Sequence, residues 1–285
     1  MASTATNRHS ESAIAANQLQ LPLASQKALR PPLKWAGGKR WLVPKLREYW
    51  APESNRRLVE PFCGGLAVTL GLLPRRSLLN DINPHLINFY TWLKKGLVIS
   101  SLDMTKDEEF FYECRKKFNK LLADGQGETV EAASLFYYLN RTCFNGLCRF
   151  NRNGEFNVPF GLYGDIPYKY NFLEYQEVFA DWEFTCKSFH EVKLRPTDFV
   201  YADPPYDVEF TQYSKDGFCW EDQERTAKWL AKHSGPVILS NQATKQILEL
   251  YGDLGYRLVK LPAPRRISCN GDRTPAEEVL ALRNL

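Results

Sequence analysis

The stretch FVYADPPYD at residues 199–207 combines groups that could hold and activate an aromatic amine. Asp203 follows an apolar run with the pattern of a buried strand. Its carboxylate can accept one N–H bond of an exocyclic amine while the Pro204 carbonyl accepts the other. Pro204 and Pro205 each remove a backbone donor and hold φ at about −65°, so the acceptors are pre-placed. With the Tyr206 ring against the ligand ring, this predicts an amine prepared for nucleophilic attack; a plain proline turn is the structural alternative.

Two stretches earlier in the chain have the pattern of a ligand site at the edge of a sheet. EPFCGG at 60–65 ends a short apolar run and opens a helix, and Asp81 ends the next apolar run. In open α/β sheets ligands bind outside the carboxyl ends of strands, and an acid at this position suits ribose hydroxyls. The chain has no G-x-G-x-x-G sequence, which disfavours a dinucleotide. An ordinary strand-to-helix turn is the alternative for each stretch.

KWAGGK at 34–39 places two glycines between an aromatic ring and an amine. Lys39 could pair with a ligand carboxylate while Trp35 packs beside it. A glycine turn with a packed tryptophan is the structural alternative.

Alternating strands and helices must position these groups. Strand–turn–helix units are expected at 56–73 and at 77–96, after a helix at 40–50. Consecutive units of this kind predict a βαβ sheet with parallel strands. Later strands are expected at 182–189, 198–206, 236–242, 255–265 and 277–285, with a helix at 221–233. Residues 97–175 differ, with a charged helical stretch followed by aromatic, asparagine and arginine residues, so one α/β domain is interrupted by an insert of about 80 residues.

Composition limits the class of protein. The 285 residues carry a net charge of +4 and are 44% hydrophobic, as in a globular protein with a mildly basic surface. No apolar run approaches the roughly 20 residues that span a bilayer, so no membrane partner is expected. Residues 1–30 lack hydrophobic periodicity and are interpreted as a flexible leader. Seven scattered cysteines and four histidines show no zinc-ligand spacing, which favours reduced thiols in a cytoplasmic protein without a metal.

These motifs, in this order, resemble the Dam-like (α-group, D12 class) DNA adenine-N6 methyltransferases. KWAGGK, EPFCGG, NDIN, the aromatic insert and DPPY carry the resemblance, with RRISCNGDRTPAEEVLAL at 265–282, over roughly residues 31–285. The resemblance implies a Rossmann-like class I methyltransferase sheet formed by 31–90 and 176–285, with a mainly helical target-recognition insert at 91–175. It implies a site-specific enzyme that methylates adenine N6 in double-stranded DNA near the nucleoid, within GATC, after base flipping.

The same resemblance assigns residues to roles. It implies S-adenosyl-L-methionine as methyl donor, S-adenosyl-L-homocysteine as product and no metal. The donor would be held by Trp35, Gly37, Gly38, Lys39, Glu60, Phe62, Gly64, Asp81 and Asp203. The catalytic residues would be Asp203, Pro204, Pro205 and Tyr206. The DNA would be contacted by Lys34, Arg141, Phe144, Asn145, Leu147, Arg149, Asn151 and Pro159.

Within the DNA-binding set, the roles differ. Phe144, Asn145 and Leu147 match positions that wedge into the gap left by the flipped base. Arg149 matches a guanine reader, whose guanidinium can bond both O6 and N7. Lys34 matches a second guanine contact, while Arg141 and Asn151 are interpreted as phosphate or support groups. Core packing is the alternative for the aromatic residues, above all for Phe136, Tyr137 and Tyr138, whose spacing suits a buried helix.

Three positions depart from the family pattern. Leu66 stands where many relatives have a second glycine, Leu162 stands where a basic residue is frequent, and Phe150 stands where tyrosine is common.

Two alternatives to DNA adenine methylation stay open: another methyl acceptor (RNA adenine, cytosine N4 or protein glutamine) and a non-catalytic DNA-binding module. A cognate restriction enzyme is an optional partner.

Overall fold

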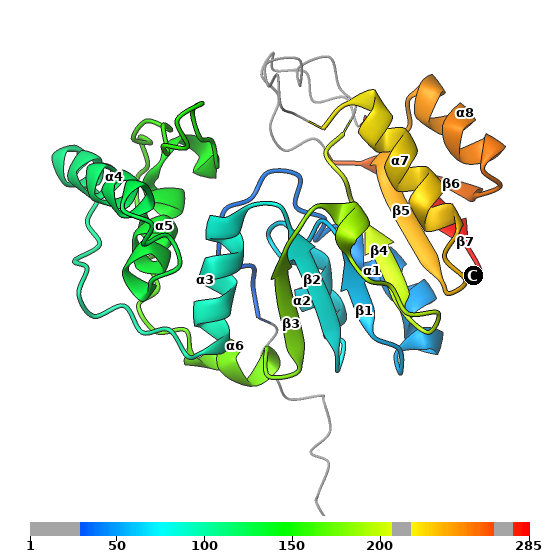
Figure 1. The fold of residues 1–285 in the computed structure, drawn as a ribbon, viewed down its shortest axis with the longest axis horizontal. Coiled ribbons are helices and arrows are strands. Elements are labelled where there is room, and N and C mark those ends of the chain that lie inside the picture. The colour runs from blue at the N-terminus through cyan, green and yellow to red at the C-terminus, as the bar shows by residue number, and fades with distance from the viewer. Residues whose placement is uncertain (1–28, 207–217, 265–275) are drawn as a thin grey trace, which may run out of the picture.

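The EPFCGG and DPPY stretches each lie at the end of a strand of one β-sheet. In the computed structural model, which describes residues 29–206, 218–264 and 276–285, seven strands pair in the order β3-β2-β1-β4-β5-β7-β6 (Figure 1). β1 to β5 run parallel, whereas β7 is antiparallel to both β5 and β6. The order 3-2-1-4-5 is that of a Rossmann-type sheet, so the predicted α/β fold is confirmed. The strands are β1 Leu58–Glu60, β2 Ser77–Asp81, β3 Trp182–Cys186, β4 Phe199–Ala202, β5 Val237–Gln242, β6 Arg257–Ala263 and β7 Ala276–Arg283.

Helices cover both faces of the sheet, because successive strand residues point into different cores. Tyr201 of β4 packs in one core with Leu46 of α1. Its neighbour Val200 packs in another core with Leu230 of α7. This alternation is the period of two that strands impose. The helices of the described residues are α1 Val43–Trp50, α2 Ala67–Leu72, α3 Pro84–Lys94, α4 Glu108–Ala123, α5 Val130–Thr142, α6 Leu173–Val178, α7 Trp220–Ala231 and α8 Lys245–Asp253, with short 3-10 turns η2 Ala51–Glu53, η3 Phe144–Gly146 and η4 Phe189–Glu191.

Local capping signals explain several helix starts. The Asn83 side chain accepts hydrogen bonds from the backbone N–H groups of His85 and Leu86, and Pro84 occupies the first turn of α3. The strand, turn and helix predicted at 77–96 are therefore confirmed. The predicted helix at 40–50 begins only at Val43, next to Pro44, because residues 40–42 form a turn. Helices α6 and α8 were not predicted; the Thr244 side chain that caps α8 was the available signal.

Within the segment between β2 and β3, α4 and α5 form a helical layer that packs on α3. α5 contacts α3 and α4, which lie to one side of the sheet in Figure 1. Phe136, Tyr137 and Tyr138 of α5 are almost completely buried in this layer, so core packing is the correct interpretation for them. The predicted insert boundary at residue 175 falls inside α6, and the role of the insert remains a prediction.

Some predictions fall on residues that the structure does not cover. The expected leader at 1–30 lies outside the described residues except for Leu29 and Arg30, and the stretch 265–282 is described only from residue 276. None of the helices in the described ranges combines the length and the apolar character needed to cross a membrane.

Candidate functional site

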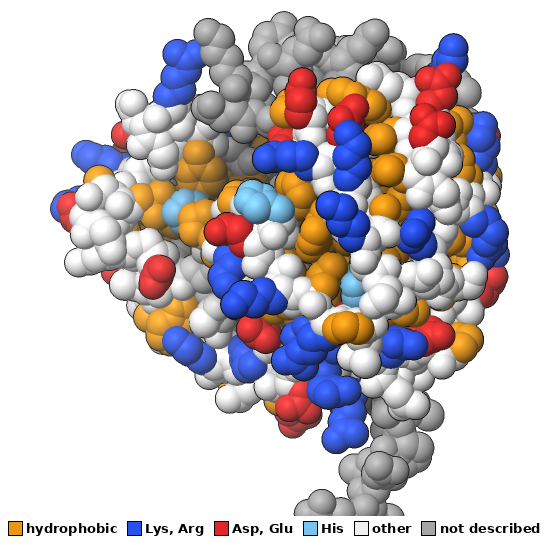
Figure 2. All heavy atoms as spheres, turned by 45° about the vertical axis from the view of Figure 1, so that its right-hand side comes forward, with side chains coloured by type: hydrophobic (Ala, Val, Ile, Leu, Met, Phe, Trp, Pro, Cys, Tyr) orange, Lys and Arg blue, Asp and Glu red, His pale blue; other side chains and the backbone are white. Residues whose placement is uncertain are grey.

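The carboxyl ends of β1, β2 and β4 meet at one edge of the sheet and surround a cavity of about 880 Å³. A recess with hydrophobic side chains in its floor is visible between the helical layer and the sheet in Figure 2. Every residue predicted to hold the donor or to be catalytic lines this cavity. They are Trp35, Gly37, Gly38, Lys39, Glu60, Phe62, Gly64, Asp81, Asp203, Pro204, Pro205 and Tyr206.

Asp81 ties the first two strand ends together. One carboxylate oxygen accepts a hydrogen bond from the Gly64 N–H at 3.1 Å, and the other accepts one from the Asn83 N–H at 3.0 Å. Burial raises the pKa of the Asp81 carboxyl, while these backbone donors oppose the shift. The backbone N–H groups of Gly64 and Asn83 thus hold the Asp81 carboxylate at the cavity wall.

Trp35 explains why the loop after β1 needs glycines. A Cβ added to Gly65 would lie 2.7 Å from Trp35 Cβ, and one added to Gly64 would lie 2.8 Å from Trp35 Nε1. Gly64 also has a positive φ of 43°, a conformation that side chains disfavour. The segment carrying Trp35 therefore packs directly on the loop backbone and forms part of the cavity wall.

Leu66, which departs from the family pattern, has a φ of 59°. It thus adopts the left-handed conformation that glycine would adopt without strain. The side chain is completely buried in the core formed with α3 and α5. The loop keeps its shape because burial compensates for backbone strain.

An aromatic wall borders the cavity on the side of β3. The Phe62 ring lies 5.4 Å from the Phe189 ring and 5.6 Å from the Phe218 ring. Ile82, directly after Asp81, is 71% exposed and lines the same cavity. Phe189, Phe218 and Ile82 were not predicted as site residues. For Ile82 the available signal was its position directly after the acid that ends β2.

The Asp203–Tyr206 turn is held by side chains as well as by its prolines. Ser240 Oγ on β5 donates to Asp203 Oδ1 at 2.7 Å. Gln223 Nε2 on α7 donates to the Pro205 carbonyl at 2.7 Å, and Asn241 Nδ2 donates to Gln223 Oε1 at 2.9 Å. Gln223 and Asn241 are buried, so the anchors are themselves fixed. The predicted rigidity therefore has a second source that the local sequence did not reveal.

Lys39 lies between carboxylates of the chain itself, whereas the sequence suggested a ligand carboxylate. Its ammonium is 3.4 Å from Asp203 Oδ2 and 3.6 Å from Glu278 Oε1 on β7. It also lies 4.4 Å from the centre of the Tyr206 ring. Burial raises the pKa of Asp203, and the Lys39 charge opposes this shift. Lys39 thus lies buried beside the Asp203–Tyr206 turn.

Glu60 lines the cavity but has a partner within the protein. Thr69 Oγ1 of α2 donates a hydrogen bond to its carboxylate. The residue is 2% exposed, and burial raises its pKa to about 8. Burial thus disfavours the charged form of Glu60, whose carboxyl group already has a hydrogen-bond partner inside the protein.

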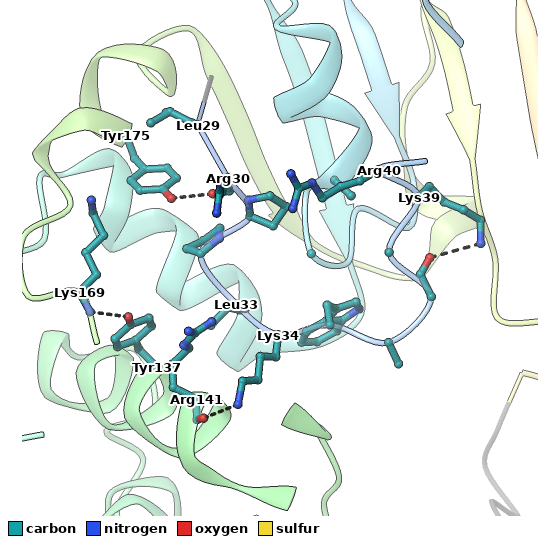
Figure 3. Close-up of a pocket in the computed structure, with 18 of the residues that line it drawn as sticks. Leu29, Arg30, Leu33, Lys34, Lys39, Arg40, Tyr137, Arg141, Lys169 and Tyr175 are labelled. Atoms are coloured by element: carbon teal, nitrogen blue, oxygen red, sulfur yellow. Dashed lines mark hydrogen bonds between the residues drawn. The ribbon is translucent and has the colours of Figure 1, made fainter. Parts of the chain in front are cut away.

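A second cavity of about 1470 Å³ adjoins the first along the segment 29–41 (Figure 3). Five of the predicted DNA-binding residues line it: Lys34, Arg141, Phe144, Asn145 and Leu147. Lys34 Nζ donates to the Arg141 carbonyl at 2.8 Å and lies 3.4 Å from the centre of the Tyr163 ring. Burial, followed by the Arg141 charge, lowers the pKa of Lys34 to about 8.

The turn η3 forms an exposed tip beside this cavity. Phe144 is 50% exposed and Leu147 37% exposed, and Asn145 has a φ of 54°. The Pro159 carbonyl accepts a hydrogen bond from the Phe144 N–H at 2.9 Å and so anchors the backbone of the turn. The aromatic ring predicted as a wedge is therefore on the surface rather than in the core.

Arg149, Asn151 and Pro159 lie outside both cavities. Arg149 is exposed, and its Nε donates to Asn157 Oδ1 at 2.8 Å. Asn151 Oδ1 accepts from the N–H groups of Asn153 and Glu155, so its side chain closes the local turn. These bonds are compatible with a support role for Asn151, and its contact with DNA stays a prediction.

The insert is also attached to the turn after β2. Asn83 Nδ2 donates to Cys148 Sγ at 3.2 Å, and the His85 ring stacks on Phe150 at 4.7 Å. These contacts fix the segment that carries Arg149 relative to Asp81. Within the described ranges, no group of three or more His, Cys, Asp or Glu side chains has the geometry of a metal site.

Comparisons with known proteins identify the family of the chain. The family model described as "D12 class N6 adenine-specific DNA methyltransferase" matches residues 35–266. The DNA adenine methylase of Vibrio cholerae is 37% identical over 276 residues, covering 90% of this chain and 96% of that protein. The Escherichia coli K12 DNA adenine methylase is 36% identical, covering 88% and 94%. The DNA N-6-adenine-methyltransferase of Escherichia phage P1 is 37% identical over 87% of this chain, which spans 35% of the phage protein.

Proposed function

This chain belongs to the D12 class of N6 adenine-specific DNA methyltransferases, and from that premise we propose that it methylates adenine N6 within GATC in duplex DNA, after flipping the base. The observation that carries the proposal is the position of the Asp203 turn. Its carboxylate lines the same cavity as Asp81 and the glycine loop. One cavity could therefore hold both the target amine and the methyl donor.

The methyl donor implied by the family is S-adenosyl-L-methionine, which supplies a methyl group on a positively charged sulfur. The residues around the 880 Å³ cavity suit a nucleoside of this kind. Asp81 can accept bonds from ribose hydroxyls, and the wall of Phe62, Phe189 and Ile82 offers apolar surface to a purine. Trp35 and the glycines of both loops complete the wall, while Glu60 contributes mainly by holding Thr69.

Asp203 and the Pro204 carbonyl are assigned to the two N–H groups of the target amine. Ser240 and Gln223 hold the turn, so the acceptors are already in position when the base enters. Preorganised acceptors of this type lower a barrier because they need not reorient during the reaction. Tyr206 is assigned to the face of the purine ring.

The low exposure of Asp203 supports the proposal that the adenine leaves the duplex. The Asp203 side chain is 19% exposed, so a base stacked within a helix could not reach it. Extrusion of one base costs a few kcal/mol. The exposed Phe144 and Leu147 side chains suit a wedge that stabilises the opened stack. Arg149, Lys34 and Arg141 are assigned to guanines and phosphates, and GATC rests on the resemblance of this segment to the Dam branch.

The test is the base and sequence context of the product. We expect the wild-type protein, incubated with donor and plasmid DNA, to produce N6-methyladenine in GATC by long-read sequencing and by nucleoside mass spectrometry. Asp203→Ala should reduce the rate by about 100- to 1000-fold, since it removes one acceptor of the target amine. Asp253→Ala, at the exposed end of α8, is the matched control and should be fully active.

Three results would contradict the proposal. A methylated cytosine, RNA adenine or glutamine would assign another acceptor. Donor binding without any methylated product would indicate a DNA-binding module. Near-normal turnover by a folded Asp203→Ala protein would show that the turn does not hold the amine.

A further inference from the structure

The Lys39 ammonium is shared between two carboxylates, the half-buried Asp203 and the buried Glu278. It lies 3.4 Å from Asp203 and 3.6 Å from Glu278, and it donates to the Gly37 carbonyl at 3.3 Å. Charge-assisted N–H···O bonds are normally about 2.7–2.9 Å long. Neither carboxylate therefore has the ammonium to itself.

The order of the strands places Glu278 beside Lys39. β7 inserts between β5 and β6, and residue 278 pairs with Gln242 at the carboxyl end of β5. Alternation along β7 turns Glu278 inward, where it is 8% exposed. The preceding Glu277 is exposed and forms an ion pair with Lys260 at 2.9 Å. Two adjacent glutamates thus have opposite environments.

The second carboxylate changes the charge of the acceptor turn. Lys39 and Asp203 alone form a neutral pair, whereas an ionised Glu278 gives the cluster a net charge of −1. Burying an extra carboxylate is unfavourable, and charge clusters of this kind are frequent at functional sites. Burial raises the pKa of Glu278, and the Lys39 charge opposes the shift. Tyr206, Tyr201, Tyr251 and Glu60 are further titratable groups that interact with the cluster.

A negative charge is useful at this position because methyl transfer moves positive charge onto the target nitrogen. The nitrogen lone pair forms the new bond to carbon, and the electron pair of the broken carbon–sulfur bond stays on sulfur. The nitrogen is then cationic until it releases a proton to water. A neutral ion pair would stabilise this charge little, and a cluster with net charge −1 would stabilise it more.

We propose that Glu278 is a positioning residue for methyl transfer, which shares Lys39 with Asp203 and keeps the acceptor turn negatively charged. The proposal rests on the proposed function. Two effects follow: Asp203 Oδ2 stays available to an amine proton, and the developing charge meets an attractive field. Glu278 acts through Lys39 and needs no contact with the DNA.

The test compares Glu278→Gln with Glu277→Gln on a duplex containing one GATC site. We expect Glu278→Gln to lower the single-turnover rate by 10- to 100-fold, with KM for DNA and for the donor changed less than threefold. Glu278→Asp, which keeps the charge, should recover at least part of the rate, and Glu277→Gln should behave as wild type. The fluorescence of 2-aminopurine at the target position, measured without donor, should be unchanged, because base flipping does not depend on Glu278.

The pH profile provides a readout that a structural role would not change. In the Gln variant Asp203 loses a negative neighbour and has Lys39 to itself, so its pKa falls. The acidic limb of the rate profile should therefore move to lower pH.

Several outcomes would overturn the inference. A rate within threefold of wild type, an unmoved acidic limb, or an equal loss in Glu277→Gln would each do so. A loss confined to KM or to 2-aminopurine fluorescence would assign Glu278 to binding instead. A wild-type protein that forms no N6-methyladenine would overturn the proposed function together with this inference, whereas an active wild type with an unaffected Glu278→Gln variant overturns the inference alone.

Discussion

Replacing Leu66 with glycine separates the two effects that shape the loop after β1. Leu66 has a φ of 59° and no exposed surface, so backbone strain and side-chain burial oppose each other at one residue. Relief of left-handed strain is worth about 1–2 kcal/mol, and glycine loses about 0.5–1 kcal/mol of backbone entropy. Loss of a buried leucine side chain costs about 2–5 kcal/mol. We expect the free energy of unfolding to fall by about 3 kcal/mol.

Alanine at the same position is the matched control, because it removes the side chain but keeps the strain. Leu66→Ala should be about 0.5–1 kcal/mol less stable than Leu66→Gly. Leu73, at the other end of α2, has a φ of 51° and is only half-buried, so Leu73→Gly should change stability by less than about 1 kcal/mol. Urea unfolding followed by circular dichroism measures all three differences.

Two results would refute this reasoning. A Leu66→Gly protein more stable than wild type would mean that strain outweighs burial. A Leu66→Ala protein more stable than Leu66→Gly would mean that the left-handed conformation costs less at this residue than the backbone entropy that glycine loses.

Other predictions follow from single contacts. The Lys34 ammonium, with a pKa of about 8, loses its charge as pH rises from 7 to 9, so DNA affinity measured by fluorescence anisotropy should fall over this range, and less so for Lys34→Arg. Gln223→Leu should leave the Pro205 carbonyl without its donor and reduce kcat about tenfold with little change in donor KM, whereas a change confined to KM would place the effect elsewhere. Asp198→Ala should destabilise the fold by about 3–5 kcal/mol in urea unfolding, because it leaves the Arg57 guanidinium without the carboxylate it bonds at 2.7 and 3.0 Å; a loss below about 1 kcal/mol would contradict this.

The local pattern of the chain was sufficient to predict most of the sheet and the position of the candidate site. Apolar runs that end in EPFCGG, in Asp81 and in Asp203 have the length of strands, and Asn83 with Pro84 marks the start of a helix. These signals depend on residues a few positions apart, which is why they can be read without the tertiary structure. Parallel strands then bring their carboxyl ends to one edge, so the grouping of the site residues followed from the strand assignment.

Tertiary structure alone decided what these groups contact. No local pattern shows that Lys39 lies between Asp203 and Glu278, because their proximity depends on β7 inserting between β5 and β6. The same holds for Gln223, which reaches the Pro205 carbonyl from α7. Sequence patterns determine which groups a segment offers, while partners distant in the chain depend on the order of the strands and on how helices pack against them.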